Sequence, residues 1–102
     1  MTRFGLEQHI LDRIVNVLAT HPLVERAVVY GSRATGNFKP QSDIDLAIYS
    51  SEMSDKEFAR LRFEIQELPI VFKLDVVRFD TLGDIGLKRK VFQEGKTIYS
   101  VS

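Results

Sequence analysis

Apolar residues recur at helical spacing in two stretches of the chain. The first lies between residues 6 and 20 and is followed by Pro22. Because the residue before a proline is pushed out of the helical region, this helix should end at His21. The second stretch follows Ser54, whose side chain can form a capping box with Glu57. Its apolar stripe comprises Phe58, Leu61, Ile65 and Leu68. Each pattern predicts a helix that buries one face.

Short apolar runs rich in β-branched residues predict strands between and after these helices. Such runs occupy residues 25–30, 43–49 and 70–78. Residues 96–101 would add a short strand at an edge of the sheet. Strands interleaved with helices indicate an α/β (α+β) arrangement in which helices cover a small sheet.

A further helix is expected near the C-terminus. Asp80 or Thr81 would cap it, it would run to about Glu94, and Gly95 would end it in a left-handed conformation. The chain of 102 residues has little room for a second core, so residues 1–102 are expected to form one domain.

Composition excludes several classes of protein. The chain has no cysteine, so a disulfide framework or a thiolate metal site is impossible. No apolar run approaches the roughly 20 residues that a membrane helix needs, and the N-terminus lacks a signal-peptide pattern, so a cytoplasmic location is expected. The 14 basic and 14 acidic residues balance, so strong nucleic-acid binding is not expected. The basic run 88–90 would be a solvated helix face, with an acidic partner or RNA as the alternative.

Three aspartates are the candidate chemical groups. Side chains alternate along a strand, so Asp43 and Asp45 should share one face while their apolar neighbours face the core. Asp75 should likewise point away from the core in the strand at residues 70–78. It would join Asp43 and Asp45 if this strand and the strand at residues 43–49 are neighbours. Three carboxylates suit a hard cation such as Mg²⁺, and two such ions could support an in-line phosphoryl displacement. Alternatively, the first two aspartates are solvated, and the third pairs with Lys73 or Arg78.

A glycine turn precedes the first two aspartates. Gly31 has no Cβ, so a phosphate could approach its backbone closely, and Ser32 could donate hydrogen bonds to that phosphate. Arg33 and Lys39 could neutralise phosphate charge, or could be ordinary loop charges. This layout indicates a phosphate-binding turn beside a metal-binding carboxylate cluster.

The string Gly31-Ser32, ten further residues and Asp43-Ile44-Asp45 resembles the signature of the DNA polymerase β-like nucleotidyltransferase superfamily. The short chain is similar to the minimal nucleotidyltransferase (MNT) branch, whose members are antitoxins of HEPN-domain toxins. The resemblance implies a polymerase β palm-like fold, with a mixed sheet flanked by helices. It also implies that Gly31 and Ser32 hold nucleotide phosphates, that Asp43 and Asp45 bind two Mg²⁺ ions, and that Asp75 activates the acceptor hydroxyl.

The resemblance further implies a reaction and a partner. The family transfers AMP from ATP to a hydroxyl, and in the MNT branch this hydroxyl belongs to a tyrosine of the HEPN toxin. Because 102 residues leave no acceptor-binding domain, another chain would supply that surface. Two alternatives stay open: an idle antitoxin that neutralises its toxin by contact, and an enzyme that modifies a small molecule.

Overall fold

The computed structural model describes residues 2–101. Its elements, in chain order, are β1 (Thr2–Arg3), β2 (Leu6–Glu7), α1 (Gln8–Ala19), β3 (Arg26–Tyr30), α2 (Ser32–Thr35), β4 (Ile44–Tyr49), α3 (Asp55–Gln66), β5 (Leu74–Arg78), the 3-10 turn η1 (Phe79–Thr81), α4 (Ile85–Glu94) and β6 (Lys96–Ser100). Within residues 2–101, no helix is both long and apolar enough to cross a membrane.

The main sheet has four strands in the order β5-β4-β3-β6. Strand β3 runs antiparallel to both β4 and β6, whereas β4 and β5 run parallel to each other. The sheet is therefore mixed, as the resemblance implied, and β6 is the edge strand that the sequence predicted. Strand β5 forms the other edge. The two short strands β1 and β2 pair separately at the N-terminus.

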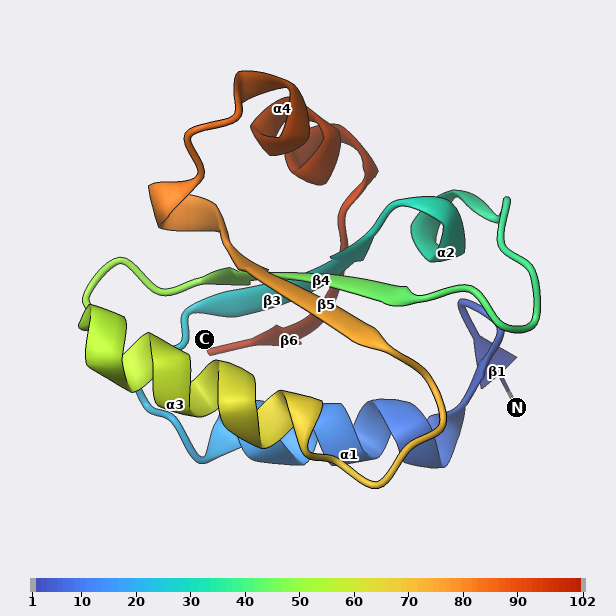
Figure 1. The fold of residues 1–102 in the computed structure, drawn as a ribbon, viewed down its shortest axis with the longest axis horizontal. Helices are drawn as coiled ribbons and strands as arrows, with labels where there is room; N and C mark the ends of the chain where they lie inside the picture. The colour runs from blue at the N-terminus through green and yellow to red at the C-terminus, as the bar shows by residue number, and fades with distance from the viewer. Residues whose placement is uncertain (1, 102) are drawn as a thin grey trace.

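Helices α1 and α3 cover one face of this sheet (Figure 1). The predicted inward-facing residues of β4, namely Ile44, Leu46 and Ile48, are fully buried on that side. The capping box of α3 is present: the Glu57 N–H donates to Ser54 Oγ at 3.1 Å, and the Ser54 N–H donates to Glu57 Oε1 at 3.0 Å. The apolar core on this face fixes which side chains of β4 and β5 point to the opposite side.

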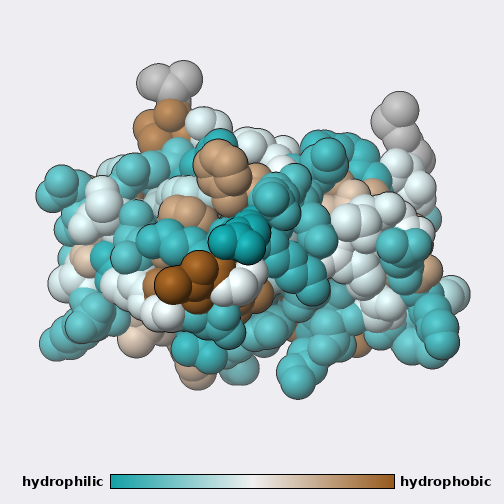
Figure 2. Space-filling view, turned by 90° about the horizontal axis from the view of Figure 1, so that it is seen from above, coloured by the Kyte–Doolittle hydropathy of each residue, from teal (hydrophilic) through white to brown (hydrophobic). Residues whose placement is uncertain are grey.

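Helix α4 and the one-turn helix α2 lie on the opposite face (Figure 1). A smaller apolar cluster lies beneath α4 and contains Val28, Tyr30, Ala47 and Val91. Figure 2 looks onto this side of the molecule, whose surface is mostly hydrophilic with a few small apolar patches. The sheet side chains under α4 are therefore buried in this small cluster, whereas Asp75 at the edge of the sheet is exposed.

Helix α4 ends at Glu94 as predicted, but its start and the conformation of Gly95 differ from the prediction. It begins at Ile85, and its cap is Asp84, whose Oδ1 accepts a hydrogen bond from the Leu87 N–H at 3.1 Å. Gly95 has φ −60° and ψ 133°, so it is extended and the expected left-handed stop is wrong. A Cβ on Gly95 would lie 2.9 Å from Val28 Cγ2, which shows that close packing against β3 requires the glycine there.

The third predicted strand is shorter than expected. Strand β5 starts at Leu74, whereas the prediction began at residue 70. Ile70 and Phe72 still pack against the core, so their apolar character reflects burial outside the regular strand.

Candidate active site

A tight turn at Gly31 joins β3 to α2. Its backbone has φ 76° and ψ −151°, a conformation that is essentially restricted to glycine. A Cβ at this position would lie 2.6 Å from Asp45 Oδ2. Glycine therefore allows the backbone to turn directly against the carboxylate of the neighbouring strand, and so the two predicted motifs meet in space.

Asp45 and Asp75 lie side by side in the parallel strands β4 and β5. The two strands are neighbours, as the expected grouping of the aspartates requires, and the predicted shared phase of Asp45 and Asp75 is confirmed. Asp45 is half-buried in an inner strand, whereas Asp75 is exposed on the edge strand. Burial and the charge of Asp75 raise the pKa of Asp45, Asp43 raises it further, and Lys90 of α4 lowers it. The site thus holds like charges that Lys90 compensates only in part.

Asp43 lies just before β4 and is exposed. Its charge acts on Asp45, so it belongs to the same electrostatic neighbourhood. Nevertheless, across residues 2–101 no three His, Cys, Asp or Glu side chains are grouped closely enough to hold one metal ion. The structure therefore brings Asp45 and Asp75 into register with Asp43 nearby, but the side chains are not arranged as a closed set of ligands. Carboxylate oxygens are ligands that Mg²⁺ prefers, so the chemistry of these side chains, but not their arrangement, fits such an ion.

Tyr30 is a site residue that the sequence reasoning missed. It lies opposite Asp45 in the antiparallel pairing of β3 and β4, and its side chain is buried. Burial, followed by the charges of Asp45 and Asp75, raises the pKa of Tyr30 to about 12. The phenol therefore keeps its proton at neutral pH and remains a hydrogen-bond donor beside the two carboxylates.

Glu94 is a second residue that the sequence reasoning missed. Its Oε1 accepts a hydrogen bond from the Gly31 N–H at 3.2 Å, which ties the end of α4 to the glycine turn. The signal was available in the sequence, because an acidic side chain in the last turn of a helix opposes the helix dipole. A hydrogen-bond donor elsewhere in the fold would offset this unfavourable interaction.

Arg33 has a different position from the one expected of a phosphate ligand. Its side chain is 2% exposed, and its guanidinium donates to three backbone carbonyls: Ser42 at 2.8 and 3.0 Å, Phe4 at 2.9 Å and Pro40 at 3.2 Å. It also lies 4.8 Å from the centre of the Phe72 ring. These contacts fasten the loop between α2 and β4 to the N-terminal hairpin. The structure therefore corrects the expected placement, because the guanidinium is engaged inside the protein and Lys39 is left as the exposed loop cation.

A glycine turn after one strand and a carboxylate pair on the next two strands of a mixed sheet define a nucleotidyltransferase-type site. The family described as "Polymerase beta, Nucleotidyltransferase" matches residues 12–102. The chain belongs to this family. A search of curated proteins finds no match.

Solved structures of toxin–antitoxin complexes have the same fold. One is a toxin–antitoxin with AMP-PNP, with a TM-score of 0.71 and 19% identity over 89% of this chain and 73% of that chain. Another is the toxin–antitoxin MntA–HepT, with a TM-score of 0.68 and 18% identity over 93% of this chain and 74% of that chain. A third is a tri-AMPylated Shewanella oneidensis HEPN toxin in complex with MNT antitoxin, with a TM-score of 0.69 and 17% identity over 94% of this chain and 74% of that chain. At these identities the likeness establishes the nucleotidyltransferase fold.

Proposed function

We propose that this protein transfers AMP from ATP to a hydroxyl group of a partner protein, and that residues 1–102 act as a minimal nucleotidyltransferase domain. The observation that carries the proposal is the register of Asp45 with Asp75 directly beside the Gly31 turn. A small binding domain has no physical need to keep these like charges together, because their repulsion costs stability.

The glycine turn would hold the triphosphate. The N–H groups of Ser32 and Arg33 donate to no protein acceptor within residues 2–101, so they are free to donate to phosphate oxygens. The Ser32 hydroxyl, at the start of α2, would add a further donor. The Gly31 N–H is held by Glu94, so Gly31 would contribute close approach of its backbone.

The transfer would proceed as follows. The acceptor oxygen forms a bond to the α-phosphorus of ATP, the bond from that phosphorus to the bridging oxygen breaks, and pyrophosphate leaves. Asp75, on the exposed edge strand, would take the proton of the attacking hydroxyl. Asp43, Asp45 and Asp75 would hold Mg²⁺, which would supply charge neutralisation for the phosphates when bound.

A HEPN-domain toxin is the partner that we propose. Three of the structures with this fold are complexes between an antitoxin and its toxin, and one of those toxins is tri-AMPylated. An acceptor tyrosine on such a partner would reach the site from the open side of Asp75.

Mass spectrometry of the partner tests the reaction. A HEPN protein encoded beside this chain is incubated with the chain, ATP and Mg²⁺, and its intact mass is measured. We expect the mass to rise in steps of one AMP with the wild type and with Glu52→Gln, whose side chain is exposed and outside the site. We expect no mass increase with Asp45→Asn. A toxin that is neutralised without any change in mass would show that binding alone is the function.

A further inference from the structure

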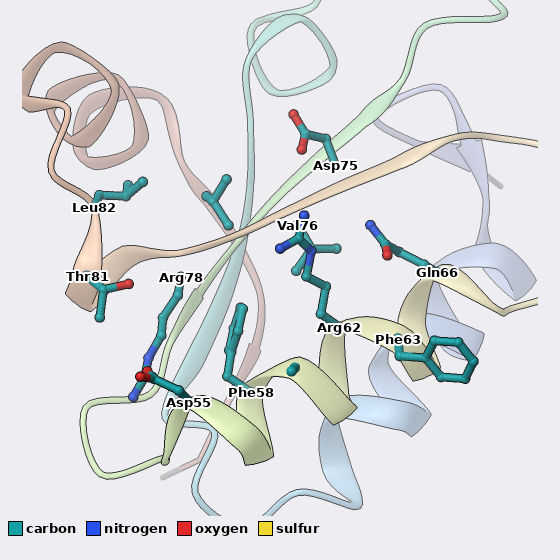
Figure 3. A pocket seen from close by; sticks show the side chains of 12 residues that line it. Asp55, Phe58, Arg62, Phe63, Gln66, Asp75, Val76, Arg78, Thr81 and Leu82 are labelled. Carbon is teal, nitrogen blue, oxygen red and sulfur yellow. The ribbon is translucent and has the colours of Figure 1, made fainter.

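The free edge of β5 borders a groove that continues from Asp75. The groove has a volume of about 650 Å³ and lies between α3 and the η1 turn (Figure 3). Its walls include Phe63 and Arg62 of α3 on one side and Leu82 after η1 on the other. Asp75 is among the residues that line this groove, so the proposed general base and the groove lie along the same strand edge.

The backbone along this edge has unpaired hydrogen-bonding groups. The Ile44 N–H donates to the Lys73 carbonyl at 2.9 Å, which fixes the residues of β5 that direct their backbone toward β4. By the alternation of a strand, Leu74 and Val76 direct their N–H and C=O groups outward, whereas Arg78 caps the η1 turn. Within residues 2–101, no backbone group outside the sheet bonds to Leu74 or Val76. Such an edge is a template for an added strand.

Arg62 gives the groove an unpaired positive charge. Its side chain extends from α3 toward β5 near Val76, while Asp75 points to the other side of the strand (Figure 3). Arg62 has no ion pair among the described residues, whereas the neighbouring Arg78 is engaged by Asp55 and by backbone carbonyls. The Phe63 side chain on the same helix is 63% exposed. The groove thus offers one free cation and one apolar contact along an open strand edge.

We infer that this groove binds an extended, acidic peptide segment of the acceptor protein, which adds as a strand to the free edge of β5 and presents its hydroxyl at Asp75. The inference rests on the proposed function and names the substrate class for the same site. Only an extended polypeptide complements a row of alternating N–H and C=O groups. A carboxylate of the segment would pair with Arg62. A small hydroxyl compound would reach Asp75 but would leave the strand edge unpaired.

A peptide pool and a chemically blocked groove test this inference. The probe is a pool of random peptides, longer than the five residues of β5, each with one central tyrosine. Because the chain has no cysteine, Phe63→Cys provides a unique attachment point for a bulky maleimide that fills the groove. Phe92→Cys, labelled in the same way, is the matched control, because Phe92 is 75% exposed on α4 and outside the groove. Far-UV circular dichroism confirms that both labelled proteins are folded.

We expect the wild type to enrich peptides with acidic residues next to the tyrosine. Blocking position 63 should weaken their binding by at least about tenfold, and blocking position 92 should leave it unchanged. Arg62→Glu should also weaken binding, whereas Arg13→Glu, an exposed change on α1, should not. A pool without enriched peptides, or peptides that bind equally well to the blocked groove, would overturn the inference. Peptides that bind in the groove but receive no AMP from ATP and Mg²⁺ would instead count against the proposed function.

Discussion

Replacing Asp45 by asparagine should stabilise the protein without ligand and remove its stabilisation by nucleotide. The carboxylate of Asp45 lies in register with Asp75, beside the turn at Gly31, in a half-buried position. Asparagine has nearly the same shape but carries no charge, so the substitution removes the repulsion and the desolvation cost while leaving the strand intact.

The magnitude follows from the geometry of the sheet. Charge pairs between neighbouring strands contribute on the order of 0.2–1 kcal/mol, and a like pair is destabilising by a similar amount. For a domain of this size, such a change corresponds to a rise in melting temperature of about 1–8 °C. The pKa of Asp45 is raised in the folded state, so the folded protein loses stability as the pH rises through that pKa. The gain of Asp45→Asn should therefore be present at pH 7 and vanish below the usual carboxyl pKa of 3.8.

Thermal unfolding with and without ATP and Mg²⁺ measures both effects. A ligand present at 100 times its dissociation constant stabilises the wild type by about 2.7 kcal/mol, and the variant should lose most of this gain. Glu52→Gln is the control for a loss of one exposed negative charge. An Asp45→Asn protein that melts lower than the wild type at pH 7, or that keeps the full nucleotide-dependent shift, would refute the account of this site.

Three further substitutions test other parts of the structure, each by melting temperature and AMP transfer. Gly31→Ala places a Cβ 2.6 Å from Asp45 Oδ2, in a backbone conformation that costs about 1–3 kcal/mol for alanine. Both the melting temperature and AMP transfer should therefore fall. An unchanged melting temperature would contradict the turn geometry. Arg33→Lys loses the forked contacts with the carbonyls and should destabilise by about 2 kcal/mol or more, yet keep the shift with ATP and Mg²⁺. A folded Arg33→Lys protein without that shift would place the side chain at the phosphates after all. Ser54→Ala removes the capping box of α3 and should cost about 1 kcal/mol. Transfer should be retained, because the capping box joins Ser54 to Glu57 and includes neither the Gly31 turn nor the aspartates. Lost transfer at a temperature where the variant is folded would contradict this separation.

The parts of the fold that the sequence predicted correctly depend on local patterns. The capping box at Ser54 depends on residues three positions apart, and the inward phase of Ile44, Leu46 and Ile48 depends on alternation within one strand. The pairing of Asp45 with Asp75 required the further assumption that β4 and β5 are neighbours, to which the family resemblance added support. That assumption is confirmed by the register of the sheet.

Contacts between distant segments explain what the sequence reasoning missed. The burial of Arg33 depends on the carbonyl of Phe4 and the ring of Phe72, which lie far from it in the chain. Glu94 likewise meets Gly31 only because α4 folds back over the sheet. Gly95 was expected to end the helix in a left-handed conformation. Glycine is found both at left-handed turns and where the backbone packs closely, so the residue type alone does not distinguish the two.

Labelled ATP distinguishes AMP transfer to the partner from any other use of the nucleotide. The partner protein is incubated with the chain, Mg²⁺ and ATP labelled either at the α-phosphate or at the γ-phosphate. The α label should become attached to the partner, the γ label should leave with pyrophosphate, and Asp75→Asn should abolish the attachment. Attachment of the γ label, or full attachment of the α label by the Asp75→Asn protein, would contradict the proposed AMP transfer.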